Sequence, residues 1–507
     1  MTVTKIDSNV TGLSFAEESS LKTLPGSPTW YGLEPNTYKD LGGTLKTVAR
    51  SPINASRQRK KGVVTDLDAA GGFNSDLTMT NLLRLMQGVF FANWREQPTS
   101  VPMNAAQKVC TAIASTSKYQ FAAPPAALVG ALVLASGFAN ATNNGLKHVA
   151  SLNSGDITVT ETLVNEASPP AAATVRQVGF EGATSDITMT VSGSTVTLGS
   201  TVLDFTTLGL LPGQWIFIGG DATIAQFANG MNGLARIGVA GVAAHALTLD
   251  KVDFVVGTTD AGTGKKIQIF VPNLLRNEPL PADIITRTYQ VERTLGSDAN
   301  GVMSQYLTGA VANQLTLNVA QATKATVDID FIACDDEQRP GTTGVKAGSR
   351  PTLVSENALN TSSDIKRMNL ALVSTNAAQP ALFGFATDAT LTLSNNAQGL
   401  KAIGVLGSFN VSSGEFDVDG KLTVYFADIA AVQAVRNNAD VTFDMFAYKD
   451  NQGHVWDAPL IGLGNGLLKV EQNKPVTLPL DAGAAQSPFG YTLSLCYFPY
   501  LPTLASA

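Results

Sequence analysis

The sequence predicts a mainly β chain in which one kind of domain occurs twice and a region of small β modules is inserted. The first supporting observation is compositional: of 507 residues only 15% are charged and 44% are hydrophobic, and 46 glycines and 23 prolines separate short apolar segments. Such a chain has enough apolar side chains for real cores, so wholesale disorder is excluded. The other two observations are internal similarities, one between the two end regions and one within residues 126–282.

The N-terminal third predicts an extended arm followed by the first part of a domain. Residues 1–30 are polar and lack periodicity, so we expect an arm. Residues 31–125 then carry the order strand, glycine-bearing hairpin, strand and helix. The strands are Val63–Asp68 and Asp76–Met79, the hairpin contains Gly71-Gly72, and the helix is Asn81–Phe91, with apolar residues at helical spacing.

The middle of the chain predicts an insertion of two similar modules over 126–282. Phe138-Ala-Asn followed by Asn144-Gly145-Leu146 recurs as Phe227-Ala-Asn followed by Asn232-Gly233-Leu234. An Asn-Gly step between apolar segments is typical of a tight turn. We therefore expect two small, β-barrel-like modules. Beyond them, the alternation in 325–332 predicts a strand, and we expect 283–340 to complete the first domain.

The C-terminal part predicts a second copy of the first domain. Residues 341–351 are rich in charge, Gly and Thr, which is typical of a linker. In 352–507 the order strand, glycine-bearing turn, strand and helix returns. Its members are Gly404–Val411, Gly414–Phe416, Lys421–Val424 and Asp428–Arg436.

Charge and motifs exclude several classes of function. Lys and Arg number 34 against 41 Asp and Glu, a net charge of −7, so the chain lacks the basic surplus of a nucleic-acid clamp. Three separate cysteines without a CxxC pair indicate neither a disulfide framework nor a zinc site. No HExxH, GxSxG or GxxxxGK[ST] pattern occurs. We therefore predict no enzymatic activity, no catalytic residue, no cofactor and no metal.

The chain also shows no sign of a membrane location. Its most apolar stretch, residues 126–138, is shorter than the roughly 20 residues that cross a bilayer. The first residues lack the apolar run of a secretory signal. We expect a protein that is made in the cytoplasm and has no membrane partner.

One dense basic cluster stands out, formed by Arg57, Arg59, Lys60 and Lys61. Three interpretations stay open: a solvated hairpin tip, a contact within an assembly, or a DNA-binding patch. No aromatic residues are interleaved with the cluster, as a single-strand stacking site would need.

Several segments resemble tail tube (major tail) proteins of long-tailed phages. The run from Arg57 to Thr78 and the helix after it are similar to the N-terminal part of such proteins. Later strands of that domain are matched by Tyr289–Leu295, Leu315–Val319 and Val327–Phe331. Leu211–Gly220 resembles insertions in larger members.

The resemblance implies a fold and an assembly. Tube domains are β-sandwiches with a flanking helix, which join sheet to sheet in six-fold rings, and the rings stack into a hollow tube for the genome. Most members carry one domain per chain and form hexamers. A duplicated chain implies instead a trimeric ring with pseudo-six-fold symmetry, with the hexamer as the alternative. Closed rings also pair exposed strand edges.

The resemblance also implies roles for charged residues. Candidates for lining the lumen are Asp66, Asp68 and Asp76 in the first copy and Glu415, Asp417 and Asp419 in the second. Alternation along strands places only some of them inside. The Arg57, Arg59, Lys60 and Lys61 cluster is the candidate inter-ring contact, because such contacts need reach and complementary charge. We expect the 126–282 modules on the outer surface.

The expected location is the virion tail. Expected partners are further copies of the chain, tape-measure and tail-terminator proteins, and double-stranded DNA in transient, non-specific passage. The alternative is another virion decoration or surface-binding β protein without a lumen. An enzyme such as a glycan depolymerase ranks third, since it needs clustered carboxylates beside aromatic platforms, and aromatic residues make up only 7% of the chain.

Overall fold

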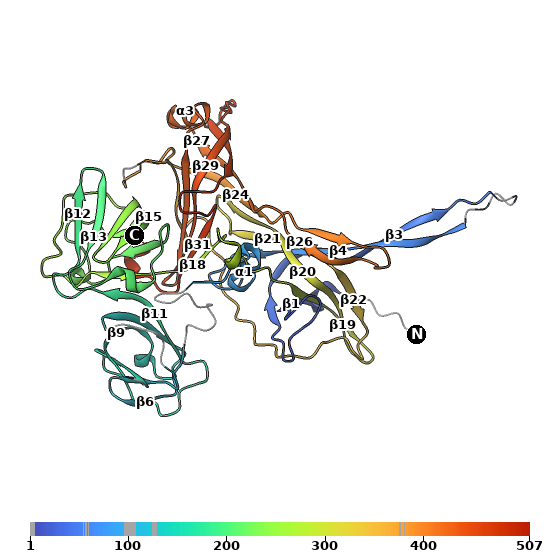
Figure 1. Cartoon of the computed structure of the whole chain (residues 1–507), viewed down its shortest axis with the longest axis horizontal. Coiled ribbons are helices and arrows are strands. Elements are labelled where there is room, and N and C mark those ends of the chain that lie inside the picture. The colour runs from blue at the N-terminus through green and yellow to red at the C-terminus, as the bar shows by residue number, and fades with distance from the viewer. Residues whose placement is uncertain are drawn as a thin grey trace.

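The computed structural model describes residues 6–53, 55, 58, 60–95, 108–123, 129–153, 155–374, 377–379 and 381–506. Arg57 and Arg59 lie outside these residues. The chain is mainly β, as predicted, with helix α1 (Leu83–Phe90) and helix α3 (Ala430–Arg436) inside the two segments expected to be helical. The inserted region lies at one end of the long axis, and the hairpin of β3 and β4 projects from the other end (Figure 1).

The strands form two large antiparallel sheets. The N-terminal part contributes β1 (Thr11–Glu17), β2 (Tyr31–Leu33), β3 (Pro35–Arg50), β4 (Lys60–Asp76), β19 (Tyr289–Asp298), β20 (Gly301–Ala320), β21 (Thr326–Ala333) and β22 (Asp335–Arg339). The C-terminal part contributes β18 (Asn273–Arg276), β23 (Ile365–Leu372), β24 (Ala386–Ser394), β27 (Asp417–Tyr425), β28 (Val441–Lys449), β29 (Gln452–Asn465), β30 (Thr477–Ala484) and β31 (Ser494–Phe498), with a separate hairpin of β25 (Gln398–Lys401) and β26 (Ser408–Ser412). All of these except the β25–β26 hairpin belong to one 16-stranded sheet.

Eight strands of that sheet follow one another in the order β3, β4, β21, β20, β24, β27, β30 and β29. We call this the eight-stranded layer. The long strands β20 and β29 enter it only with their C-terminal parts. Their N-terminal parts bend away and pair with other strands, in the order β1, β19, β20, β22 on one side and β23, β28, β29, β31 on the other. Apolar side chains between the layers form the main core.

The inserted region forms the second, 13-stranded sheet. Its strands are β5 (Lys108–Val109), β6 (Ala112–Ser115), β7 (Lys118–Gln120), β8 (Ala131–Ser136), β9 (Gly145–Leu152), β10 (Asp156–Val159), β11 (Thr174–Glu181), β12 (Thr188–Ser192), β13 (Thr195–Gly199), β14 (Trp215–Ile218), β15 (Gly233–Ala243), β16 (Ala246–Val252) and β17 (Gln268–Phe270). Two hydrophobic cores lie in it, one built from residues 110–175 and one mainly from 180–271. Strands β5 to β7 pair here although they precede residue 126. Strand β18 lies within 126–282 but pairs with β31 of the C-terminal part.

The predicted hairpin at Gly71-Gly72 is wrong, because β4 runs unbroken through both glycines. These glycines serve close strand packing. A Cβ on Gly71 would lie 2.8 Å from the Cα of Leu41 in β3, and one on Gly72 would lie 2.5 Å from the carbonyl oxygen of Ile329 in β21. The predicted turn at Gly414 is also no hairpin between its flanking segments, since β26 pairs with β25 and β27 pairs with β24 and β30. β1, inside the segment expected to be an arm, pairs with β19.

Candidate functional site

One face of the eight-stranded layer is polar from edge to edge. Along β4, Leu67, Ala69 and Phe73 are buried in the core, while Asp66, Asp68 and Asp76 alternate with them and point to the opposite side. Strand β21 shows the same alternation, with Val327, Ile329 and Phe331 buried and Asp328 and Asp330 opposite them. We call this side the polar face.

The strand register aligns polar or small residues in rows across the face. Directly paired residues point to the same side of a sheet. One row runs through Thr37, Asn74, Asp328, Thr316, Thr392, Asp419, Gly483 and Gly462. The neighbouring row contains Asp76, Thr326, Asn318, Thr390, Lys421, Asp481 and Gly464. Unbroken pairing therefore places carboxylates from strands far apart in sequence on one surface.

Lysines on this face lie beside carboxylates. The Nζ of Lys39 donates to Asp330 at 3.0 Å and lies 3.8 Å from Asp328. The Nζ of Lys324 lies 2.6 Å from Asp76. These positive charges are thus partly neutralised within the chain, and the carboxylates are held apart by cations.

A second ion cluster lies where β4 leaves the layer. The Nζ of Lys401, from the β25–β26 hairpin, donates to Asp66 at 2.9 Å and to Asp68 at 2.8 Å, and Lys46 of β3 pairs with both carboxylates. The hydrogen bond from Lys401 lowers the pKa of each aspartate below its usual value. This hairpin also covers an apolar cluster at the same place, in which Val411 lies with Val311 and Cys334.

Five of the six acidic residues singled out in the sequence share the polar face, and one does not. Asp66, Asp68 and Asp76 come from β4, and Asp417 and Asp419 from β27. Glu415 lies in the exposed connection between β26 and β27. Of the basic cluster, Lys60 and Lys61 begin β4 and are exposed. The sequence reasoning missed Asp328, Asp330 and Asp481, although the alternation of Asp with Val, Ile and Phe in 327–331 was a usable signal.

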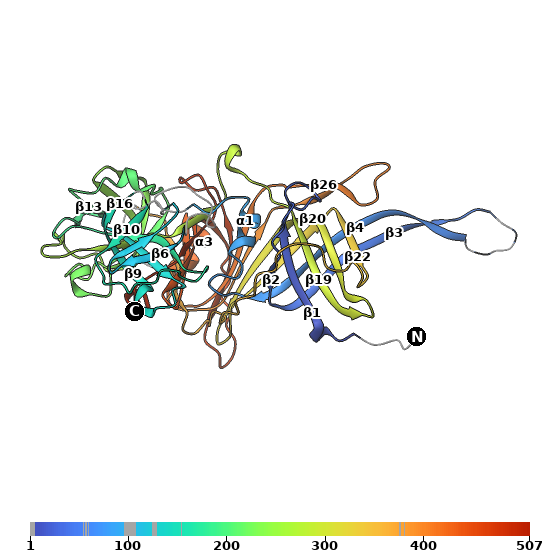
Figure 2. The same cartoon turned by 90° about the horizontal axis from the view of Figure 1, so that it is seen from below.

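The inserted region is joined to the C-terminal part of the molecule by a shared core and buried ions. Phe217 and Phe270 of the insertion pack with Val455 and Phe498 in one hydrophobic cluster. Beside it lies a cluster of buried or half-buried charged residues: Arg236, Asp250, Lys251, Asp253, Arg367, Asp444 and Asp457. Figure 2 shows the insertion against this side of the molecule, remote from the β3–β4 hairpin.

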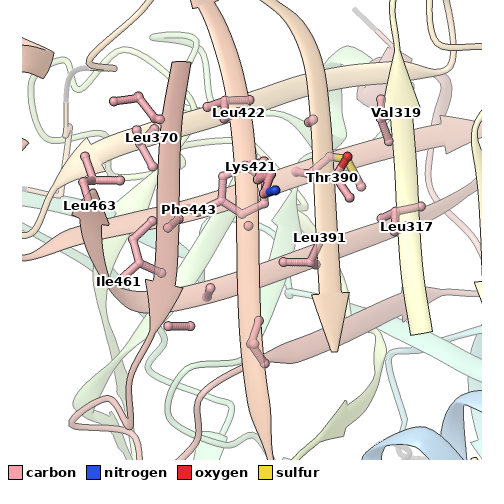
Figure 3. Close-up of a pocket in the computed structure, with 18 residues that line it drawn as sticks. Leu317, Val319, Leu370, Thr390, Leu391, Lys421, Leu422, Phe443, Ile461 and Leu463 are labelled. Atoms are coloured by element: carbon pink, nitrogen blue, oxygen red, sulfur yellow. The ribbon is translucent and has the colours of Figure 1, made fainter. Parts of the chain in front are cut away.

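No described feature resembles a catalytic centre. A cavity of about 50 Å³ lies in the core behind β24 and β27 and is lined almost entirely by apolar side chains such as Leu317, Leu422 and Phe443 (Figure 3). Among the described residues, no group of three or more His, Cys, Asp or Glu side chains could hold a metal ion. None of the described helices is long and apolar enough to cross a membrane. The described cysteines, Cys110, Cys334 and Cys496, are free and buried.

Comparison with protein families gives one match: the family model described as phage tail tube protein matches residues 8–482. The match spans both ends of the eight-stranded layer and the inserted region between them. A comparison with curated proteins finds no match.

Proposed function

The chain belongs to the phage tail tube protein family, and on this premise we propose that three copies close into a ring whose bore is the polar face. Membership confirms the coarser predictions: the protein is a structural component of the virion tail, self-polymerises there, and is not an enzyme. The ring copy number, the lumen residues and the further partners are our proposals.

The observation that carries the proposal is the eight-stranded layer with its two free edges. Among the described residues, β3 pairs only with β4, and the C-terminal part of β29 beyond Ile461 pairs only with β30. Unpaired strand edges favour pairing with another chain, and a closed ring removes them. We propose that β29 of one subunit pairs with β3 of the next, just as β20 pairs with β24 inside the chain.

The strand order supports a duplicated tube domain. In the layer, β3, β4, β21 and β20 of the first domain match β24, β27, β30 and β29 of the second. Outside the layer, β1, β19, β20 and β22 match β23, β28, β29 and β31. A helix follows β4 in one domain and β27 in the other. With two such domains in each chain, a ring of six lobes contains three chains instead of six.

The polar face suits a DNA conduit. Each phosphate contact from a free Lys or Arg adds counterion-release affinity and slows transit. Aspartates with paired lysines offer few such contacts, so DNA meets a surface that repels it weakly and binds it poorly. We propose that Asp76, Asp328, Asp330, Asp419 and Asp481 line the bore, with Asp66, Asp68 and Asp417 nearer its end.

The inserted region supports a second duplication, of modules carried on the outside of the ring. Both modules have one strand order, β6, β7, β10, β9, β8, β11 and β12, β13, β16, β15, β14, β17. Asn144 accepts a hydrogen bond from the backbone of Phe138 at 2.9 Å, and Asn232 accepts one from Phe227 at 2.8 Å. In both places, therefore, the phenylalanine of the Phe-Ala-Asn motif donates its backbone N–H to the asparagine of the following Asn-Gly step. The insertion packs on the strands behind the polar face, which supports an outer position.

Electron microscopy of the purified chain across a concentration series tests the proposal. We expect hollow rings with three-fold symmetry and six similar inner lobes, stacking into tubes. Rings of six chains would refute the trimer. Closed oligomers without a bore would favour a decoration or surface-binding protein over a conduit. A tape-measure protein, as a proposed partner, should increase tube formation when added, and a tail-terminator protein should bind the tube end and stop its growth.

A further inference from the structure

We propose that the basic tip of the β3–β4 hairpin binds the acidic start of β27 in the neighbouring subunit of the same ring. The tip is defined as Arg50, Lys60 and Lys61, and the acceptor as Glu415 and Asp417. The inference rests on the proposed ring. It assigns the basic cluster to a contact within a ring instead of between rings.

A contact of the same kind already exists inside the chain. The β25–β26 hairpin extends from β24 and β27 of the second domain. It crosses the seam between the two domains, which is the β20–β24 pairing, and reaches β4 of the first. There the ammonium group of Lys401 donates to Asp66, Asp68 and the carbonyl oxygen of Leu67, at 2.9, 2.8 and 2.5 Å. This contact serves as a template for the seam between subunits.

The two domains place equivalent residues at equivalent positions. Asp76 and Tyr425 are the last residues of β4 and β27, and they pair with the first residues of β21 and β30, Thr326 and Thr477. Counting back from these anchors, Asp417 takes the place of Asp68, and Glu415 takes the place of Asp66. The second domain therefore repeats the acidic pair that Lys401 binds in the first.

The β3–β4 hairpin of the first domain carries cations at its tip, as the β25–β26 hairpin of the second domain carries Lys401. The β3–β4 hairpin occupies the place of the β24–β27 hairpin and its β25–β26 extension, and it projects well beyond the body of the chain (Figure 1). Arg50 pairs in register with Lys60, so like charges lie side by side at its tip. Within the described residues Lys60 and Lys61 form no ion pair, and neither does Glu415.

Charge and direction point to a second copy as the occupant. Arg50 and Lys60 are exposed cations on paired positions of the projecting hairpin, and they repel one another unless a partner supplies carboxylates. The β25–β26 hairpin leans from β24 toward β20, β21 and β4, so a hairpin leaning the same way from β3 reaches the next β29, β30 and β27. Exposed Val48 and Val63, 57% and 53% accessible on the same ribbon, add apolar surface for the contact.

Cysteine cross-linking tests the contact in assembled tubes. We expect Glu415→Cys combined with either Lys60→Cys or Lys61→Cys to give covalent subunit multimers on oxidation. Both hairpin positions are used because successive residues point to opposite faces. The chain's own described cysteines are buried, so background should be low. Lys474→Cys with Glu415→Cys is the matched control and should give none.

Charge reversal provides an independent readout. Lys60→Glu with Lys61→Glu should raise the concentration needed for assembly about tenfold or more, as the loss of a close interfacial charge pair does. Adding Glu415→Lys and Asp417→Lys to this variant should return the concentration needed for assembly to the wild-type value. Tubes that form normally in microscopy but show no cross-link from either pair would overturn the inference while leaving the ring intact. If the wild-type chain forms no ring, the proposed function itself fails.

Discussion

Replacing Arg236 with methionine tests how the inserted region is held to the rest of the chain. The guanidinium of Arg236 donates to Asp250 through Nε and Nη2, at 3.0 Å each, and to Asp457 through Nη1 at 3.0 Å. Its side chain is 3% exposed, and that of Asp457 is completely buried. Methionine keeps most of the length and apolar volume but leaves the carboxylate of Asp457 without this cation.

The expected loss of unfolding free energy is about 3–5 kcal/mol at neutral pH, because removing one partner strands a buried charge. Burial raises the pKa of Asp457 to about 6 even with Arg236 present. A raised native pKa means that the folded state binds the proton more tightly, so stability falls as pH rises from the ordinary carboxyl range through about 6. Without Arg236 this pKa rises further. The variant should therefore lose more stability at pH 8 than at pH 5.

The assay is urea unfolding of the unassembled chain, followed by tryptophan fluorescence. Trp215 reports on this joint, since the guanidinium of Arg236 lies 5.9 Å from its ring centroid. Arg436→Met, at an exposed position on α3, is the control and should change stability by at most about 0.5 kcal/mol. An equal loss at pH 5 and pH 8, or one no larger than the control's, would refute this account of the joint.

Three further predictions concern the polar face, the inserted region and the core. Asp66→Asn with Asp68→Asn frees two lysines, so tubes of this variant should bind double-stranded DNA in a salt-dependent manner by fluorescence anisotropy, whereas wild-type tubes should not. In the wild type, the hydrogen bond to Glu161 raises the pKa of His148 to about 9, so the stabilisation from this imidazolium is present at neutral pH and lost as pH rises through about 9. Glu161→Gln removes that carboxylate, and NMR titration of the variant should show a lower pKa for His148. Phe331→Ala should cost about 3–5 kcal/mol in urea unfolding, since this side chain is 2% exposed and packs against other aromatic rings.

Local patterns predicted the parts of the fold that depend on local chemistry. Helical spacing located α1 and α3, and strict alternation located β21, because burial on one side imposes a period on each element. The Gly71-Gly72 hairpin was wrong for a physical reason: glycine permits a turn but also permits close approach of neighbouring strands, and the sequence alone does not distinguish these uses. Strand β1 was missed because its seven-residue pairing is with β19, more than 270 residues away, while its nearby partner β2 pairs with it over only three residues.

The sequence predicted the acidic character of the candidate site better than it predicted which residues form the site. Six acidic residues on or beside β4 and β27 were identified, and five of them share the polar face. Asp481 was missed because its place depends on pairing between β27 and β30, which are separated by a helix and two strands. The pairing of Lys401 with Asp66 joins residues that are 335 positions apart, so no local pattern indicates it. The buried ions around Arg236 likewise join segments more than 200 residues apart.

The two seams of the proposed ring differ in when they form, and the free edges reflect this. The β20–β24 seam closes when the chain folds, and it is a regular ladder with no register shift. The seam between β29 and β3 must wait for a partner, so each edge has to resist premature pairing. Strand β3 carries four register shifts against β4 and charged side chains at Lys39 and Lys46, and the free end of β29 is short and contains Gly462 and Gly464. Irregular, charged or short edges disfavour indiscriminate pairing. An assembly with such edges gains from a long hairpin that reaches the neighbour first, because a tethered contact raises the effective concentration of the two strands before they join.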